Sequence, residues 1–157
     1  SGDVSVLIGI QDICLVSYTV TICCLNVGVN TFRLMDAVPR RFLEEFYVSP
    51  REFLRELDYL EGFQPKKHRY TVRFHSGRLD LDKAESKCST SVKIEGESVI
   101  VVGFDQRFMK DALNQFKDEP RVRIKLSGGI CPIILEAEGR NDFAMVLPVR
   151  LHDRMAA

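Results

Sequence analysis

The sequence predicts an α+β fold in which a strand–helix–three-strand unit (βαβββ) occurs twice. Each unit opens with an apolar strand, continues into a capped amphipathic helix and closes with three strands. Two helices can cover six or more strands only if they lie side by side. We therefore expect two adjacent helices on one face of a curved antiparallel sheet.

The first unit starts with a strand at 44–48. Ser49 is expected to cap the next helix, with Pro50 at its first position and Glu52 at its third, which is a capping-box pattern. This helix, expected at about 50–61, carries one apolar stripe made of Phe53, Leu54, Leu57 and Leu60. After Gly62, strands are expected at 70–74, 78–82 and 91–94.

The second unit repeats this order, starting with a strand at 98–102. Asp105 is expected to cap a helix at about 105–117, and its apolar face combines Phe108, Met109, Ala112, Leu113 and Phe116. Strands are expected at 121–126, 131–135 and 143–147. Before these units, residues 4–36 show the composition of extended structure, and Pro39 marks a domain boundary.

Composition sets limits on the function. The 157 residues carry 22 basic and 22 acidic side chains, so a strongly basic nucleic-acid binder is not indicated, although a local basic surface remains possible. The apolar start lacks a basic leader and is interrupted by Asp12, so we expect a cytoplasmic protein with no membrane partner. The five cysteines form no C-x-x-C pair, which favours reduced, mostly buried thiols over a disulfide frame or a metal site. We expect no cofactor.

The strongest pattern lies in three segments: 98–117, 122–126 and 143–151, the last ending in Leu-Pro-Val-Arg-Leu. Their order and spacing resemble the C-terminal domain of the bacterial sliding clamp, the β subunit of DNA polymerase III. The resemblance implies the DNA-clamp fold. It also implies that residues 1–38 hold the closing strands of a preceding clamp domain plus a linker, that 39–151 form the C-terminal clamp domain, and that 152–157 are a tail.

Basic residues recur at helical spacing on the polar faces of both helices. Taken alone, this spacing favours an ordinary solvated face, and acidic residues on the same helices weaken any strong field. The resemblance implies instead that these faces line a channel and contact the DNA backbone weakly and without sequence preference, through Arg51, Arg55, Arg107, Lys110 and Lys117.

The C-terminal segment has two interpretations. It can be an edge strand in which Pro148 prevents further pairing. The resemblance implies one wall of a hydrophobic groove that captures short linear motifs, formed by Pro39, Arg40, Phe108, Pro132, Met145, Val146, Leu147, Pro148, Val149, Arg150 and Leu151. It also implies a ring interface at Tyr59 and Leu60, together with the strand near 89–93.

The resemblance implies a DNA replication processivity factor, which tethers polymerase to duplex DNA by ring enclosure and is not an enzyme. Its partners would be DNA, DNA polymerase and clamp-loader subunits, with a homo-oligomeric ring in the full-length protein. The alternative is a clamp-like interaction module that does not encircle DNA. A third interpretation, a small enzyme, is less favoured, because no carboxylate pairs recognisably with His or Cys and no phosphate loop is present. Loss of an activity on mutation of Asp105 or Cys131 would be needed to support it.

Overall fold

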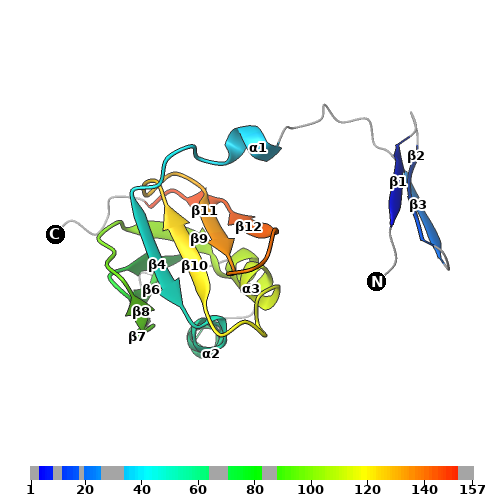
Figure 1. Ribbon diagram of the computed structural model, residues 1–157. Coiled ribbons are helices and arrows are strands. Elements are labelled where there is room, and N and C mark those ends of the chain that lie inside the picture. Colours follow the sequence, from blue (N-terminus) through cyan, green and yellow to red (C-terminus); the bar gives the residue numbers. More distant parts are fainter. Residues whose placement is uncertain are drawn as a thin grey trace. The chain divides into compact units, whose positions relative to one another are not determined.

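The computed structural model of the protein (Figure 1) describes residues 4–8, 12–17, 20–25, 34–63, 71–82 and 88–151. The chain divides into two compact units, Ser1–Leu34 and Met35–Ala157. No helix within the described ranges is long and apolar enough to cross a membrane.

The first unit contains an antiparallel sheet with the strand order β1-β2-β3, formed by Ser5–Ile8, Asp12–Val16 and Thr21–Leu25. Cys14 and Cys23 lie directly opposite each other on β2 and β3, with 4.2 Å between their Cα atoms, and form a disulfide. The expectation of reduced thiols throughout is therefore wrong for this pair, because the register of the two strands brings the sulfur atoms together.

A short helix, α1, spans Leu34–Ala37. The prediction of extended structure up to residue 36 is wrong for this segment, because Leu, Met and Ala favour a helix more than a strand. The helix ends before Val38, where the following proline disfavours helical backbone.

The second unit confirms the expected α+β fold and its duplication, but each copy has four strands after its helix instead of the expected three, and the strands form two sheets instead of one. The first copy consists of β4 (Glu44–Val48), α2 (Pro50–Glu61), β5 (Thr71–His75), β6 (Arg78–Asp82), β7 (Cys88–Ser91) and β8 (Ile94–Glu95). The second consists of β9 (Val102–Asp105), α3 (Gln106–Asn114), β10 (Val122–Leu126), β11 (Ile133–Glu136), β12 (Phe143–Val146) and β13 (Pro148–Val149).

The strands form two five-stranded antiparallel sheets, in the orders β12-β11-β10-β4-β8 and β13-β9-β5-β6-β7. Each copy gives its first strand to the other copy's hairpin, since β4 pairs with β10 and β9 pairs with β5. Each copy also ends on the opposite sheet, with β8 on β4 and β13 on β9. This exchange gives the unit a pseudo-twofold arrangement and makes the two copies inseparable.

The second copy begins four residues later than expected. The strand predicted at 98–102 forms only from Val102 onward, because residues 98–100 donate hydrogen bonds to the Glu44 carboxylate instead of pairing with a strand. That carboxylate accepts hydrogen bonds from Ser98 Oγ at 2.9 Å and from the backbone N–H groups of Val99 and Ile100, both at 3.0 Å. These bonds hold the connection between the two copies against β4.

The core lies between the helices and the sheets. Phe46 stacks on Phe74 at 5.3 Å between ring centroids, and Phe53 lies 5.9 Å from Phe74 and 6.4 Å from Phe104. Leu57 and Leu113 are fully buried, as the apolar stripes predicted. Phe108 is 57% exposed, so its predicted place on the buried face of α3 is wrong. Gln106 is buried in the core-facing turn of α3 instead.

Candidate functional site

Helices α2 and α3 contact each other and run in opposite directions. The end of α2 contacts the start of α3, where buried Gln106 Nε2 donates a 2.6 Å hydrogen bond to the Leu57 carbonyl. At the other end, Arg51 Nε donates to the Lys117 carbonyl at 2.9 Å. We call the surface formed by the exposed residues of these two helices the α2–α3 face.

Local signals set the start of each helix as predicted. Ser49 Oγ accepts from the Glu52 N–H at 3.4 Å, and Asp105 Oδ1 accepts from the Arg107 N–H at 3.0 Å. The second half of the expected capping box differs, because the Glu52 carboxylate accepts from the Lys93 N–H at 3.4 Å. Asp105, considered above as a catalytic candidate, is the helix cap.

Four of the five basic residues predicted to face DNA are engaged with carboxylates. Lys110 Nζ lies 2.5 Å from Asp58 Oδ1 and 2.6 Å from Glu61 Oε2, so it bridges the two helices. Burial disfavours its charged form, but the hydrogen bonds and charges of Asp58 and Glu61 outweigh this and raise the pKa of Lys110. Arg51 Nη2 lies 3.4 Å from Asp118.

Two further predicted DNA-facing residues, Arg55 and Arg107, follow the same pattern. Arg55 donates two hydrogen bonds to Glu56 Oε1, at 2.9 and 2.8 Å. Arg107 binds both oxygens of Asp105, and these hydrogen bonds raise the pKa of Arg107. Lys117 is exposed at the end of this face. The structure thus gathers these cations on one face, together with carboxylates.

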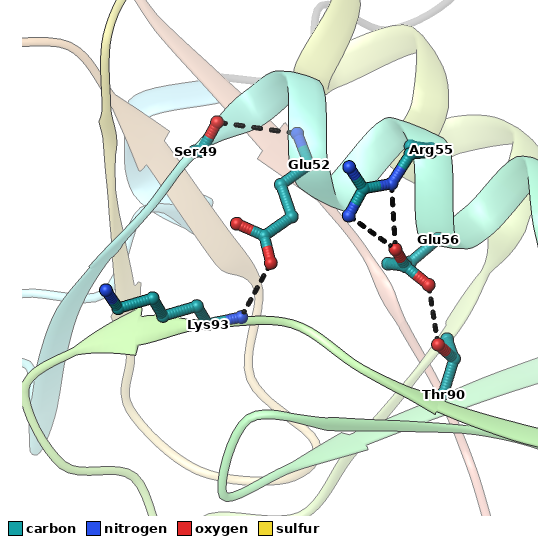
Figure 2. A network of polar contacts seen from close by, with 6 residues as sticks. All are labelled: Ser49, Glu52, Arg55, Glu56, Thr90 and Lys93. Atoms are coloured by element: carbon teal, nitrogen blue, oxygen red, sulfur yellow. Dashed lines mark hydrogen bonds and ion pairs between the residues drawn. The ribbon is translucent and has the colours of Figure 1, made fainter.

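A polar network joins α2 to the edge strand β7 (Figure 2). Thr90 Oγ1 donates a 2.6 Å hydrogen bond to Glu56 Oε2, and Arg55 binds the other oxygen. The bond from Thr90, followed by that from Arg55, lowers the pKa of Glu56 against the opposing effect of burial. Sequence reasoning missed this network, because Glu56 and Thr90 are 34 residues apart.

The predicted ring-interface residues differ in exposure. Tyr59 is 53% exposed and packs edge-on against Phe63, with 5.1 Å between the ring centroids. Leu60 is fully buried, so its side chain contributes to the core instead of to an interface. The edge strand β7 ends its sheet in the described part of the chain, next to α2.

The C-terminal segment crosses from one sheet to the other. Val146 pairs with Ile133 on β11, and Pro148 pairs with Phe104 on β9, so the chain changes sheets at Leu147. Leu147 is 62% exposed at this crossing. Val146 is only 2% exposed, so the prediction that its side chain lines a groove is wrong: the strand alternation points it into the core.

Gly103 determines how closely this segment can approach β9. A Cβ atom on Gly103 would lie 2.6 Å from Leu151 Cδ2 and 2.9 Å from the Val149 carbonyl oxygen. Any larger residue would push β13 and Leu151 outward. A glycine within the apolar run 100–104 is a sequence signal of such a close approach, and it was not used in the predictions above.

The other predicted groove residues are half-buried or exposed. Phe108 is exposed on α3, which packs against β12 and β9. Pro132 precedes Ile133, the partner of Val146, and is half-buried. Met145, Pro148, Val149 and Leu151 are half-buried, and Arg150 is exposed. Pro39 and Arg40 precede Arg41, whose carbonyl accepts a 2.6 Å hydrogen bond from Ser127 Oγ.

No group of three or more potential metal ligands occurs among the described residues. The polar chemistry that the structure shows consists of ion pairs, helix caps and backbone anchors.

No protein-family model matches the sequence, and no curated protein matches it. Solved sliding clamps match the fold. DNA polymerase III β from Caulobacter crescentus gives a TM-score of 0.75 at 16% identity, with 94% of this chain and 41% of that one covered. The sliding clamp from Pseudomonas aeruginosa gives 0.74 at 17% identity, with 96% and 42% covered. The Bacillus subtilis clamp gives 0.70 at 19% identity, with 95% and 41% covered.

At these identities the comparisons establish the fold: the chain has the fold of bacterial DNA polymerase sliding clamps. It spans 41–42% of the length of these three clamps.

Proposed function

We propose that this chain is part of a DNA replication processivity factor, a sliding clamp that tethers polymerase to duplex DNA by enclosure. The observation that carries the proposal is the duplicated unit with exchanged first strands and two side-by-side helices, which sliding clamps share. In this proposal residues 39–151 act as a C-terminal clamp domain and 1–38 as the closing strands and linker of the domain before it.

In such a ring, the α2–α3 face is turned toward DNA, and Arg51, Arg55, Arg107, Lys110 and Lys117 are its candidate contacts. Enclosure requires no catalytic group, so the protein acts as a non-catalytic accessory subunit. Tyr59 and the edge strand β7 form the contact to the next subunit. The exposed Tyr59–Phe63 pair supports this, because a solvent-exposed aromatic pair beside an open strand edge suits an extended partner segment.

The surface around Leu147 is proposed to bind short linear motifs of polymerases and clamp-loader subunits. Leu147 and Phe108 are more than half exposed, at 62% and 57%. Half-buried Pro132 lies just before β11, and half-buried Met145 lies on β12. Apolar side chains at the point where a strand leaves its sheet suit an extended apolar peptide. With one wall of the groove supplied by upstream sequence, we expect a Kd of roughly 1 mM for this chain alone.

The test is an NMR titration of the isotopically labelled chain with a clamp-binding peptide. Shifts should cluster on residues 145–151 and on Phe108. Phe108→Ala should weaken binding, and Phe63→Ala, a matched loss of an exposed aromatic side chain, should not. Absence of any shift at millimolar peptide, or shifts confined to residues 4–25, would refute the groove assignment.

The alternative is a clamp-like interaction module that does not encircle DNA. The carboxylates that engage the cations of the α2–α3 face favour this second candidate. Retention of the full-length protein on circular duplex DNA, followed by its release when the DNA is linearised, would distinguish a ring from a module.

A further inference from the structure

We propose that the Cys14–Cys23 disulfide is a reversible redox clasp: its reduction by a thiol of the glutathione class opens the β1–β2–β3 sheet and leaves the second unit folded. The inference goes beyond the proposed function, because it concerns the first unit and holds whichever role the second unit has. It rests on the access to the sulfur atoms, on the exposure of the side chains around them and on the place of a third cysteine.

A thiol in solution can reach this disulfide. Cys23 is exposed on β3, and its partner Cys14 is half-buried on β2. Solvent-exposed disulfides are the labile and regulatory class. An incoming thiolate therefore attacks Cys23 Sγ more readily than Cys14 Sγ.

The exchange needs two thiol molecules, RSH, and no other reactant. The first thiolate attacks Cys23 Sγ and forms a mixed disulfide, while the bond to Cys14 breaks and Cys14 leaves as a thiolate that takes up a proton. The second thiolate attacks the mixed disulfide at the sulfur of the first molecule, which releases Cys23 as a thiol and forms RSSR. The protein disulfide gains two electrons and two protons, two RSH are oxidised to RSSR, and glutathione disulfide reverses both steps.

The side chains of this sheet give it little support besides the disulfide. Val6, Leu15 and Ile22 lie opposite one another across the three strands, yet they are 57%, 40% and 53% exposed. The side chains at 4–7, 13–17 and 20–24 are all exposed or half-buried. Within these residues the strands gain little free energy from apolar burial, and a small sheet without a buried face is marginally stable in water.

The disulfide closes a short loop, because its two cysteines are nine positions apart. At the end of this loop Ser17 N–H donates to the Val20 carbonyl at 2.8 Å. A cross-link over such a loop restricts the open chain and favours the paired strands by roughly a hundredfold. Because β2 is the middle strand, opening it also releases β1.

The second unit does not share this dependence. Its core residues, Phe46, Leu57 and Leu113 among them, are fully buried. Cys88 and Cys131, its cysteines, are free, so a thiol has no disulfide to reduce there. The second unit is therefore an internal control within the same chain.

Cys24 provides a matched control beside the clasp. It is free and exposed on β3, directly after Cys23, and pairs in register with Ile13. Consecutive residues of a strand point to opposite faces of the sheet. Cys24 therefore lies on the other face from the disulfide and takes no part in the exchange while the strands are paired.

The experiment follows hydrogen–deuterium exchange of the intact chain by mass spectrometry, in buffer with glutathione disulfide and in buffer with reduced glutathione. On reduction, the amides of 12–17 and 20–25 should exchange up to about a hundredfold faster. The amides of β4 and β10 should not change. Protection should return when glutathione disulfide is added back.

Two variants complete the test. Cys14→Ser/Cys23→Ser lacks the clasp, so its first unit should exchange rapidly in both buffers, while circular dichroism reports the second unit as folded. Cys24→Ser should respond to reduction as the unaltered chain does, because it keeps the clasp.

Equal exchange of 12–17 and 20–25 in the two buffers would overturn the inference. So would faster exchange of β4 and β10 on reduction, slow exchange of the first unit in Cys14→Ser/Cys23→Ser, or loss of the response in Cys24→Ser. The peptide titration does not bear on these outcomes, so the clamp function and the redox clasp can fail separately.

Discussion

Leu113→Ala on α3 tests the packing between the helices and the sheets. The side chain is completely buried, so its truncation removes apolar contacts and leaves a cavity. Fully buried leucines replaced by alanine cost roughly 3–5 kcal/mol of unfolding free energy. Helix propensity does not offset this, because leucine and alanine are both strong helix formers.

The matched control on the same helix is Phe108→Ala. The apolar pattern places Phe108 and Leu113 on one buried face, whereas the structure leaves Phe108 57% exposed, with the Arg107 guanidinium 5.7 Å from its ring centroid. We expect this change to cost about 1 kcal/mol or less, since it removes surface contact and a weak cation–π interaction.

Urea denaturation of both variants and the unaltered chain measures the difference. With an m-value of about 2 kcal/mol/M, a 3 kcal/mol loss in Leu113→Ala lowers the midpoint by about 1.5 M, and Phe108→Ala lowers it by less than about 0.5 M. Equal midpoints for the two variants would refute the packing described for α3.

Glu56→Gln should flatten the pH dependence of stability. The lowered pKa of Glu56 stabilises the fold at pH values above 4.5, the ordinary pKa of the group, and this contribution is lost as the pH falls through the folded-state pKa. The urea midpoints at pH 6 and pH 3.5 should therefore differ less in the variant than in the unaltered chain. An unchanged difference would contradict the role of the Thr90 hydrogen bond. Deletion of residues 152–157 should strengthen peptide binding if the tail competes for the groove, which the NMR titration measures; weaker binding would mean that the tail assists capture. Maleimide labelling followed by mass spectrometry should modify three cysteines in the non-reduced, unfolded chain and all five after reduction, and five before reduction would rule out the Cys14–Cys23 disulfide.

Local chemistry was sufficient to predict the repeating elements. Ser49 and Asp105 satisfy the first N–H groups of their own helices through contacts with residues two or three positions away, so the sequence specifies them directly. Alternation in 121–126 predicted the central strand β10 within one residue. The resemblance in 98–126 and 143–151 predicted the clamp fold, which the solved clamps match.

The tertiary structure alone decided which partner each element meets. The exchange of β4 and β9 between copies and the Cys14–Cys23 disulfide depend on the registers of paired strands. The later start of the second copy depends on hydrogen bonds from Glu44 to residues 54 or more positions away. Helical periodicity groups Phe108 with Leu113, and only the structure shows that Phe108 is exposed while Leu113 is buried. Sequence thus determined the elements and their apolar faces. Only the packed structure determined that Lys110 meets Asp58 and Glu61, since an ion pair between helices requires both helices to be in place.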